Sequence, residues 1–475
     1  MKRIKKFIIY IITLSIILAC YTPSSVHAEE YTPIDTRNPD EAEGTTEADL
    51  ERVHAMQIQS NKWENWPAGP VTNGEAAIVM DATNGAILYA KNIDGYAYPA
   101  SITKILTTLV ALENAELTDT VTATEDSINS LESGYANIGF KVGEEVSLED
   151  ALYAVLLASA NEVTHAVGSS VGEGYDWFIE KMNSRAKELG AVNSHFVNTN
   201  GMHDDDHYTT AKDMALITRE LLNNHPEFEK IAQTIQYTIG KTNITDESRT
   251  FQQVHKMFYE SSEYFDSRVI AGKTGYTIPA RNTLVTCTDD GNLKLITVVL
   301  KTYGKNVYID TEALINYGHD NFEKIDIVKS TLSEEISSKI TDVASGSYVT
   351  VPKGVSLEDL KVEFTNNNDG TGVLSYTYNG TSVGTIEVSV PMKVAEKPTE
   401  KKEEIKKSNG FTIVKILAVI FIAVALLFVV FLVILLVYRE KKRAERRRRR
   451  EMRRQRYLRE QEMQMRQEAR RKERR

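Results

Sequence analysis

The chain has 475 residues and a formal net charge of −10 at pH 7, and 42% of its residues are hydrophobic. This length suggests two or three domains and an ample core. Only two cysteines occur, Cys20 and Cys287, which excludes a fold held by a disulfide framework. Residues 439–475 hold 19 Lys and Arg against 7 Asp and Glu, a net of +12, so the rest carries −22. Such asymmetry indicates that the two parts face different surroundings.

The first residues have the pattern of a cleaved secretory signal. Four Lys and Arg precede an apolar run of about a dozen residues. Val26 and Ala28 are small residues before a cut after Ala28. We therefore predict a signal peptide over residues 1–28. Lipid attachment at Cys20 is the alternative, but Leu18 fits a lipoprotein box poorly.

A second apolar segment lies near the other end of the chain. Residues 416–437 carry no charge over 22 residues, and as a helix they would reach about 33 Å, enough to cross a bilayer core. A buried core helix is the alternative, but a run of Lys and Arg follows at once, which is the positive-inside pattern. We predict a transmembrane helix over 411–438 and a basic cytoplasmic tail over 439–475, with the bulk of the chain outside the cell.

Between these segments, strand and helix patterns succeed one another. Residues 29–64 are acidic and poor in apolar residues, which predicts a disordered spacer. Two β-rich runs then surround Asn84-Gly85 and predict a hairpin. Helical patterns follow over 101–113, 148–171, 175–189 and 211–223, and strand patterns return over 269–277, 281–290 and 293–301. This order predicts an α+β fold: an antiparallel sheet flanked by helices, with its first and last strands distant in sequence and a helical cluster inserted between them.

From about Ile325 the pattern changes again. Apolar and polar residues alternate with period two, and Asn379-Gly380 separates two such runs. We predict a small all-β domain over residues 325–394. A charged linker over 395–410 then leads to the predicted transmembrane helix.

Ser101 and Lys104 stand three positions apart at the start of the first predicted helix. Residues i and i+3 share a helix face, so both side chains would point into one cavity. A serine hydroxyl is a weak nucleophile and needs an adjacent base. Apolar neighbours of Lys104 would lower its pKa by desolvation, which makes a neutral amine available as that base.

Two further polar triplets strengthen this assignment. Ser159 and Asn161 follow an apolar run at a point where the helix pattern hesitates, and polar side chains pressed against a core need partners. Lys273 and Thr274 lie in a strand pattern, where Gly275 removes a side chain and lets another backbone approach. A lysine, a threonine hydroxyl and an open strand edge suit an extended peptide that ends in a carboxylate.

Each triplet also has a purely structural interpretation. Ser184 and Lys187 repeat the Ser-x-x-Lys spacing on a polar helix, and Ser127 to Asn129 repeats Ser-x-Asn. An exposed edge lysine is common. The conjunction is more specific than its members, because Ser-x-x-Lys, Ser-x-Asn and Lys-Thr-Gly occur in that order. This set is known from penicillin-binding proteins and class A β-lactamases.

On these motifs the chain resembles the D-alanyl-D-alanine carboxypeptidases, the low-molecular-mass serine penicillin-binding proteins. The stretches that carry the resemblance lie in family order between Trp66 and Met392: AAIVMDATNGAILYAKN, PASITKILTTLVALE, DALYAVLLASANE, HFVNTNGMHDDDHYTTAKDMALI and GKTGYT. The resemblance implies a catalytic domain with a β-lactamase/penicillin-binding protein-like fold, expected over residues 65–324. It also implies removal of the terminal D-alanine from peptidoglycan pentapeptides, without a cofactor or a metal.

The resemblance implies a role for each motif residue. Ser101 would attack the carbonyl between two D-alanines and form an acyl-enzyme, and Lys104 would take its proton. Ser159 would relay a proton to the leaving nitrogen, and Asn161 would hold the substrate amide. The terminal carboxylate and the oxyanion are expected at Lys273, Thr274, Gly275 and Tyr276, with the N–H groups of Ser101 and Tyr276 forming the oxyanion hole. β-Lactams would acylate the same serine.

Some residues depart from the family pattern or suggest other chemistry. Glu162 stands where the family often has Asp after Ser-x-Asn. Arg281 replaces a glycine that commonly follows Lys-Thr-Gly-x-Thr, which puts the local shape of the cleft and the deacylation rate in doubt. The HDDDH cluster, His203 to His207, could suggest a metal site, but a family loop is the favoured interpretation. Cys287 fits a buried strand residue better than a reactive thiol.

Three other functions stay open. A class A β-lactamase would need a deacylating glutamate in a Glu-x-x-Leu-Asn loop, and none occurs between Asn161 and Lys273. Endopeptidase or transpeptidase activity is not distinguished from carboxypeptidase activity. A non-catalytic wall-binding protein is disfavoured, because every motif residue is intact.

The expected partners follow from the same resemblance and from the apolar segments. They are stem peptides ending in D-Ala-D-Ala, β-lactams and one membrane, crossed once. We expect a bacterial cell-membrane protein with an extracytoplasmic catalytic domain. The basic tail is either a solvated topological anchor or a helix on anionic lipid. No nucleic acid is expected.

Overall fold

The computed structural model describes residues 47–130 and 134–391. The predicted signal peptide (1–28), charged linker (395–410), transmembrane helix (411–438) and basic tail (439–475) lie outside the described residues. Within the described part, no helix combines the length and the apolar character that a membrane span requires.

The helices and strands alternate along the chain. The helices are α2 (Glu47–Ala55), α3 (Lys104–Asn114), α4 (Glu125–Asn129), α5 (Leu148–Leu156), α6 (Asn161–Ser170), α7 (Tyr175–Glu188), α8 (Ala211–Asn224), α9 (Pro226–Ala232), α10 (Asn306–Asn321) and α11 (Glu334–Ser337). The strands are β1 (Ala76–Asp81), β2 (Ile87–Lys91), β3 (Thr120–Thr122), β4 (Glu145–Ser147), β5 (Gln236–Ile239), β6 (Arg249–Gln252), β7 (Val269–Thr277), β8 (Arg281–Asp289), β9 (Lys294–Thr302), β10 (Phe322–Asp326), β11 (Asp342–Val343), β12 (Tyr348–Pro352), β13 (Leu360–Asn366), β14 (Thr371–Tyr378) and β15 (Thr381–Ser389).

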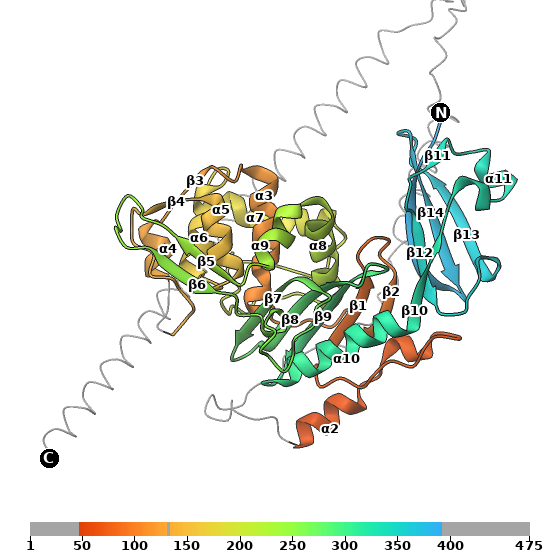
Figure 1. Cartoon of the computed structure of the whole chain (residues 1–475), viewed down its shortest axis with the longest axis horizontal. Helices are drawn as coiled ribbons and strands as arrows, with labels where there is room; N and C mark the ends of the chain where they lie inside the picture. Colours follow the sequence, from red (N-terminus) through yellow and green to blue (C-terminus); the bar gives the residue numbers. More distant parts are fainter. Residues whose placement is uncertain (1–46, 131–133, 392–475) are drawn as a thin grey trace, which may run out of the picture. The chain divides into compact units, whose positions relative to one another are not determined.

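The largest sheet is antiparallel and has five strands in the order β2-β1-β9-β8-β7. Figure 1 shows these strands side by side. β1, near the start of the described chain, pairs with β9 far along it, with Ile78 opposite Val298. The predicted α+β sheet, whose first and last strands are distant in sequence, is therefore confirmed. Its edge strand β7 carries the Lys-Thr-Gly triplet.

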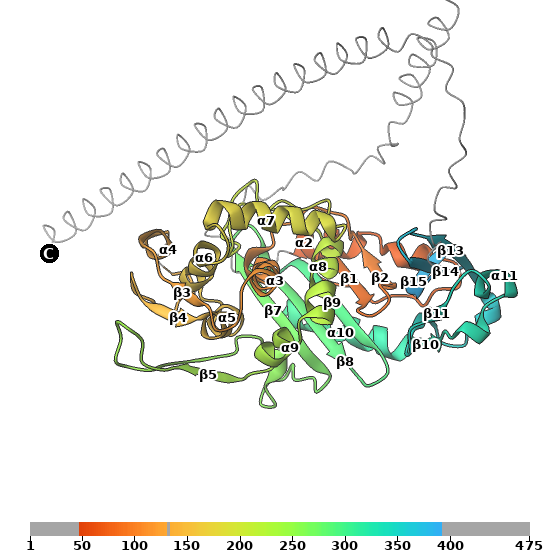
Figure 2. The same cartoon turned by 90° about the horizontal axis from the view of Figure 1, so that it is seen from above.

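Alternating side chains give this sheet two apolar faces. Ile78 and Val298 belong to a core shared with α3, α5, α6 and α8. Val79 and Leu295 belong to a second core shared with α10. The helical cluster inserted between β2 and β7 therefore covers one face and α10 covers the other (Figure 1). Figure 2 shows α3, α5 and α6 grouped within that cluster.

The helical pattern predicted over 148–171 forms two helices instead of one. α5 ends at Leu156 and α6 begins at Asn161. Between them Ser159 has a φ of 56°, a left-handed conformation that is uncommon for a residue with a side chain. The patterns over 175–189 and 211–223 agree with α7 and α8 to within one residue at either end.

The prediction of a disordered spacer over 29–64 is wrong from residue 47 onward. That segment holds α2 and the 3₁₀ helix η2 (Gln59–Lys62), and Val53 and Ser60 are buried. The Ser60 hydroxyl accepts the N–H of Ala90 in β2 at 3.2 Å. Contacts with the sheet order this segment, and its acidic composition does not reveal them.

The residues after α10 form two smaller sheets. β10 pairs with β12, and the other sheet has the order β11-β15-β14-β13. Asn379 and Gly380 both have positive φ in the turn between β14 and β15, as an Asn-Gly hairpin requires. The predicted boundary at residue 325 falls inside β10.

These strands are joined to the β1–β2 hairpin by buried contacts. The Thr350 hydroxyl donates a hydrogen bond to Asp81 Oδ2 at 2.7 Å. The same hydroxyl oxygen, Thr350 Oγ1, accepts a hydrogen bond from Asn84 Nδ2 at 2.8 Å. Val349 and Tyr376 share the second core with Val79. The junction is therefore both polar and apolar.

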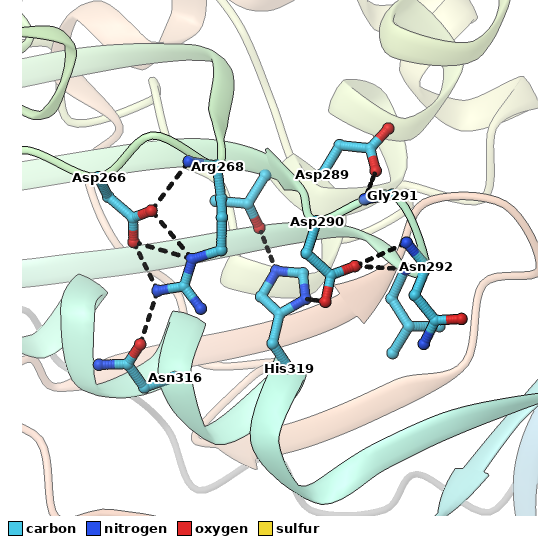
Figure 3. A network of polar contacts seen from close by, with 10 residues as sticks. Asp266, Arg268, Asp289, Asp290, Gly291, Asn292, Asn316 and His319 are labelled. Carbon is cyan, nitrogen blue, oxygen red and sulfur yellow. Dashed lines mark hydrogen bonds and ion pairs between the residues drawn. The ribbon is translucent and has the colours of Figure 1, made fainter.

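A polar network ties α10 to the sheet on the second face (Figure 3). Arg268, just before β7, donates to Asn316 Oδ1 at 2.6 Å. His319 Nε2 lies 2.9 Å from Thr288 Oγ1, and its Nδ1 lies 3.0 Å from Asp290 Oδ2. Asn316 and His319 on α10 thus attach the helix to β8, to Arg268 just before β7 and to Asp290 just after β8.

The network predicts a pH-dependent stability. Burial, the largest effect, lowers the pKa of His319 below its usual value, although Asp290 opposes the shift. In the unfolded chain the His319 imidazole is protonated as the pH falls through about 6.5. In the folded chain it is protonated only at lower pH. Acidification should therefore destabilise the fold, because the unfolded chain binds more protons. His319→Gln removes this titration. Urea denaturation between about pH 7.5 and 5.5 should show a smaller loss of unfolding free energy in the variant; equal losses would contradict the assignment.

Candidate active site

The Ser-x-x-Lys pair lies where a short 3₁₀ helix runs into an α-helix. Ser101 belongs to η3 (Ala100–Thr103), and α3 begins at Lys104. The predicted helix over 101–113 is thus present, with a tighter first turn. Ala100, directly before Ser101, has a φ of 52°. This turn brings Lys104 Nζ to 2.9 Å from Ser101 Oγ.

Three oxygen atoms surround the Lys104 nitrogen. Nζ donates to Asn161 Oδ1 at 2.8 Å and to the Asn200 carbonyl at 2.7 Å, and its third contact is Ser101 Oγ. Amide and carbonyl oxygens can only accept hydrogen bonds. A neutral amine has two N–H groups for those acceptors and one lone pair for the hydroxyl proton of Ser101. The geometry therefore suits Lys104 as a general base.

Burial favours the neutral form of this amine. Lys104 has no exposed surface. Its pKa lies well below the usual value, chiefly because of burial and then because of the nearby Lys273, whereas Glu162 acts in the opposite direction. Removal from water disfavours an ammonium ion, so the fold favours the unprotonated amine that a general base requires.

Lys273 links the second triplet to the third. Its Nζ donates to Ser159 Oγ at 3.0 Å and to the Thr274 carbonyl at 3.0 Å. Burial lowers the pKa of Lys273 to about 7, so both of its charge states are accessible near neutral pH. Asn161 contacts Lys104 and Ser159 contacts Lys273. The three motifs that the sequence placed far apart are thus brought together.

The third triplet lies directly against the nucleophile's turn. A Cβ added to Gly275 would lie 3.0 Å from the Ser101 backbone nitrogen and 2.3 Å from Thr283 Oγ1. Thr283 in β8 donates to the Pro99 carbonyl at 2.8 Å. The close backbone approach predicted for Gly275 is therefore present.

The remaining predicted substrate residues line the same strand. Thr274 is half-buried, and Tyr276 is 53% exposed. β7 is the last strand of its sheet in the described part of the chain. An edge strand offers backbone groups to an extended peptide, so this arrangement suits a chain end laid along β7.

Sequence reasoning missed the loop before α8. Gly201 has a φ of 81°, and a Cβ there would lie 1.8 Å from the Ala100 carbonyl. The loop therefore packs directly on the turn that holds Ser101, and its Asn200 carbonyl reaches Lys104. The Asn-Gly dipeptide is a turn signal, but nothing in it indicates which side chain the carbonyl will meet.

His207 was also missed as a support of the site. Its Nδ1 accepts the Val197 N–H at 3.1 Å, so Nε2 carries the proton and donates to Thr103 Oγ1 at 2.9 Å. Thr103 in turn donates to the Ala100 carbonyl at 2.8 Å. Complete burial lowers the pKa of His207 to about 3. The neutral imidazole of His207 therefore stabilises the turn that holds Ser101, through its hydrogen bond to Thr103.

The other candidate residues lie outside this chemistry. Ser184 and Lys187 are exposed on α7. Cys287 is buried in β8, where burial raises its pKa. Among the described residues, no group of three or more His, Cys, Asp or Glu side chains is arranged to hold a metal ion.

Arg281 closes the β7–β8 hairpin in an unusual way. It has a φ of 56° and is only 3% exposed. Its guanidinium carbon lies 5.2 Å from the centre of the Tyr303 ring, a cation–π contact worth about 0.5–2 kcal/mol. A backbone conformation that favours glycine is thus adopted here by a packed arginine.

The approach of β7 to η3 predicts the effect of one methyl group. In Gly275→Ala the new Cβ would displace Thr283 and push β7 away from Ser101. We expect acylation by a penicillin to slow by on the order of 100-fold, because small displacements of reacting groups have effects of that size. Gly240→Ala is the matched control, since a Cβ there meets nothing within 4 Å. The measurement is the stopped-flow rate of acylation of the wild type and both variants, compared among proteins whose thermal stabilities are equal. An unchanged rate in Gly275→Ala would refute the close approach.

The chain is similar to known proteins along most of its described length. Among curated proteins, the D-alanyl-D-alanine carboxypeptidase DacF of Bacillus subtilis is 26% identical over 356 residues, which cover 72% of this chain and 88% of DacF. The D-alanyl-D-alanine carboxypeptidase DacA of Escherichia coli is 28% identical over 365 residues, which cover 73% and 87% of the two chains. Among solved structures, penicillin-binding protein 5 of Haemophilus influenzae aligns with a TM-score of 0.54 at 23% identity and covers 68% of this chain and 98% of its own.

The solved structure shows that the fold is that of a penicillin-binding protein. The model of the family Peptidase_S11, described as D-alanyl-D-alanine carboxypeptidase, matches residues 64–304. That span is half of the chain and contains all three motifs. The chain therefore belongs to the D-alanyl-D-alanine carboxypeptidase family.

Proposed function

We propose that this serine peptidase removes the terminal D-alanine from peptidoglycan pentapeptides through an acyl-enzyme on Ser101. The observation that carries the proposal is the buried Lys104 amine, 2.9 Å from Ser101 Oγ, with its two other contacts to oxygens that only accept. That arrangement activates a hydroxyl without a histidine.

Acylation uses the groups around the serine in turn. Lys104 takes the hydroxyl proton while Ser101 Oγ attacks the carbonyl carbon between the two D-alanines. The N–H groups of Ser101 and Tyr276 stabilise the oxyanion, at about 3 kcal/mol per donor. Asn161 holds the substrate amide, and Lys273 with Thr274 binds the terminal carboxylate.

Release of the D-alanine needs a proton on its nitrogen. Ser159 relays that proton, and Lys273 orients the Ser159 hydroxyl through the contact at 3.0 Å. Water then attacks the ester and regenerates Ser101, with Lys104 again as the base. A β-lactam would acylate the same serine, because its reactive carbonyl and its carboxylate are arranged in space like those of a peptide that ends in D-Ala-D-Ala.

The rest of the chain would place this chemistry at the cell surface. We propose export by residues 1–28, a single membrane span over 411–438 and a cytoplasmic basic tail over 439–475. The strands after residue 325 would form a small all-β domain that holds the catalytic domain away from the bilayer. The apolar segments and the uneven charge of the sequence support this arrangement.

Loss of the Ser101 hydroxyl should abolish both reactions. The full-length protein should release D-alanine from a peptide ending in D-Ala-D-Ala and gain the mass of one penicillin. Ser101→Ala should do neither, whereas Ser184→Ala, which alters the exposed copy of the motif, should behave as wild type. Mass spectrometry and a D-alanine assay make the measurement. Penicillin bound to Ser101→Ala, or a folded wild type that releases no D-alanine, would overturn the proposal.

A further inference from the structure

Glu162, where the family often has an aspartate, lies directly behind the active site. It follows Asn161 in the first turn of α6 and is only 1% exposed. Its Oε1 accepts the N–H of Ile138 at 2.7 Å and lies 3.5 Å from the nitrogen of Phe140. A buried carboxylate that accepts backbone N–H groups holds that backbone in place.

Asn161 fastens the same segment at a second point. The Ala136 carbonyl accepts hydrogen bonds from the Asn161 backbone N–H at 3.0 Å and from its Nδ2 at 2.9 Å. With Nδ2 engaged there, Oδ1 of the same amide is the atom that faces Lys104 Nζ. The orientation of the Asn161 amide therefore depends on the position of Ala136, and Glu162 holds the chain only two residues further on.

Few residues of this segment are buried. Ala136 and Asn137 are exposed, and Phe140 is the one buried residue between 134 and 140. Gly134 and Gly139 have positive φ, which allows sharp changes of direction but adds no side-chain contacts. The hydrogen bonds to Glu162 and Asn161 therefore fix the backbone of residues 136–138 on α6, and the buried Phe140 anchors the end of the segment in the core.

Glu162 also acts on Lys104 through its charge. The titratable groups that face Lys104 are Lys273 on β7, Glu162 on α6 and His207 in the loop before α8. Lys273 lowers the pKa of Lys104, and Glu162 raises it. The second oxygen of Glu162, Oε2, is buried and accepts no hydrogen bond from the described residues. Burial raises the pKa of Glu162 itself, and backbone N–H groups, first that of Ile138, oppose this shift by favouring the charged carboxylate.

We propose that Glu162 is a positioning residue, which orients Asn161 through residues 136–140 and places a buried carboxylate beside the contact between Asn161 and Lys104. The inference rests on the proposed acylation of Ser101. An aspartate is one carbon shorter and would not reach the Ile138 N–H unless the segment moved. The glutamate thus couples a surface segment to the general base.

Glu162→Gln separates the charge from the hydrogen bonds. The amide oxygen can accept the same two N–H groups, but the negative charge is gone, so Lys104 should stay neutral to lower pH. The acid limb of the second-order rate of acylation by a fluorescent penicillin should therefore move to lower pH. Glu173→Gln is the matched control on an exposed glutamate just beyond the other end of α6, and its acid limb should coincide with that of the wild type.

Glu162→Asp separates the two effects in the opposite way. It keeps the charge near Lys104 but loses the reach to Ile138. The acid limb should stay near that of the wild type, and the rate should fall roughly tenfold, because Asn161 is less well oriented. The amides of Ile138 and Phe140 should exchange with solvent faster in the full-length variant, as hydrogen–deuterium exchange would report.

The outcomes distinguish this inference from the proposed function. A wild-type acid limb in a folded Glu162→Gln, or a wild-type rate in Glu162→Asp, would overturn the positioning role while acylation itself persists. A wild type that is not acylated overturns the proposed function, and this inference falls with it. If Glu162→Gln does not fold, the rate and the exchange of Glu162→Asp decide the matter.

Discussion

The rest of this structure depends on the contacts between the Lys104 amine and the three oxygen atoms that enclose it. In water Lys104 would be an ammonium ion and could take no proton. Inside the protein it has no exposed surface, and two of its neighbours can only accept hydrogen bonds. Desolvation and the neighbouring Lys273 favour the neutral amine. The third neighbour, the Ser101 hydroxyl, then becomes the natural proton donor. Nucleophile and base are therefore defined by one buried contact.

Segments from distant parts of the chain build that enclosure. η3 and α3 provide the serine and the lysine, the start of α6 provides Asn161, the loop before α8 provides the Asn200 carbonyl, and β7 provides Lys273. Some of the residues in and near these segments have strained backbone conformations. Ala100, Ser159 and Arg281 all have left-handed φ values, each costing on the order of 1–3 kcal/mol. The sheet and the two cores on its faces hold these conformations in place.

Much of this arrangement could be predicted because it follows from local rules. The spacing of Ser101 and Lys104 puts them on one face whether the turn is α or 3₁₀, and strand alternation marks β7, β8 and β9. Other parts depend on tertiary contacts that no local pattern encodes. The Asn200 and Ala136 carbonyls are backbone groups, and every residue has one. His207 was part of a suspected metal cluster, yet its partners are Thr103 and Val197. Residues 47–64 look disordered in composition but pack on the sheet. The signal peptide, membrane span and tail stay predictions.

The charge state of Lys104 can be observed directly. Full-length protein labelled with ¹³C at the lysine ε-carbons would be titrated by NMR, and the Lys104 resonance assigned from its loss in Lys104→Arg. Exposed lysines titrate near pH 10.4. The account predicts that the Lys104 resonance has its midpoint well below that value and moves when a penicillin occupies Ser101. A Lys104 resonance that titrates together with those of the exposed lysines would contradict it.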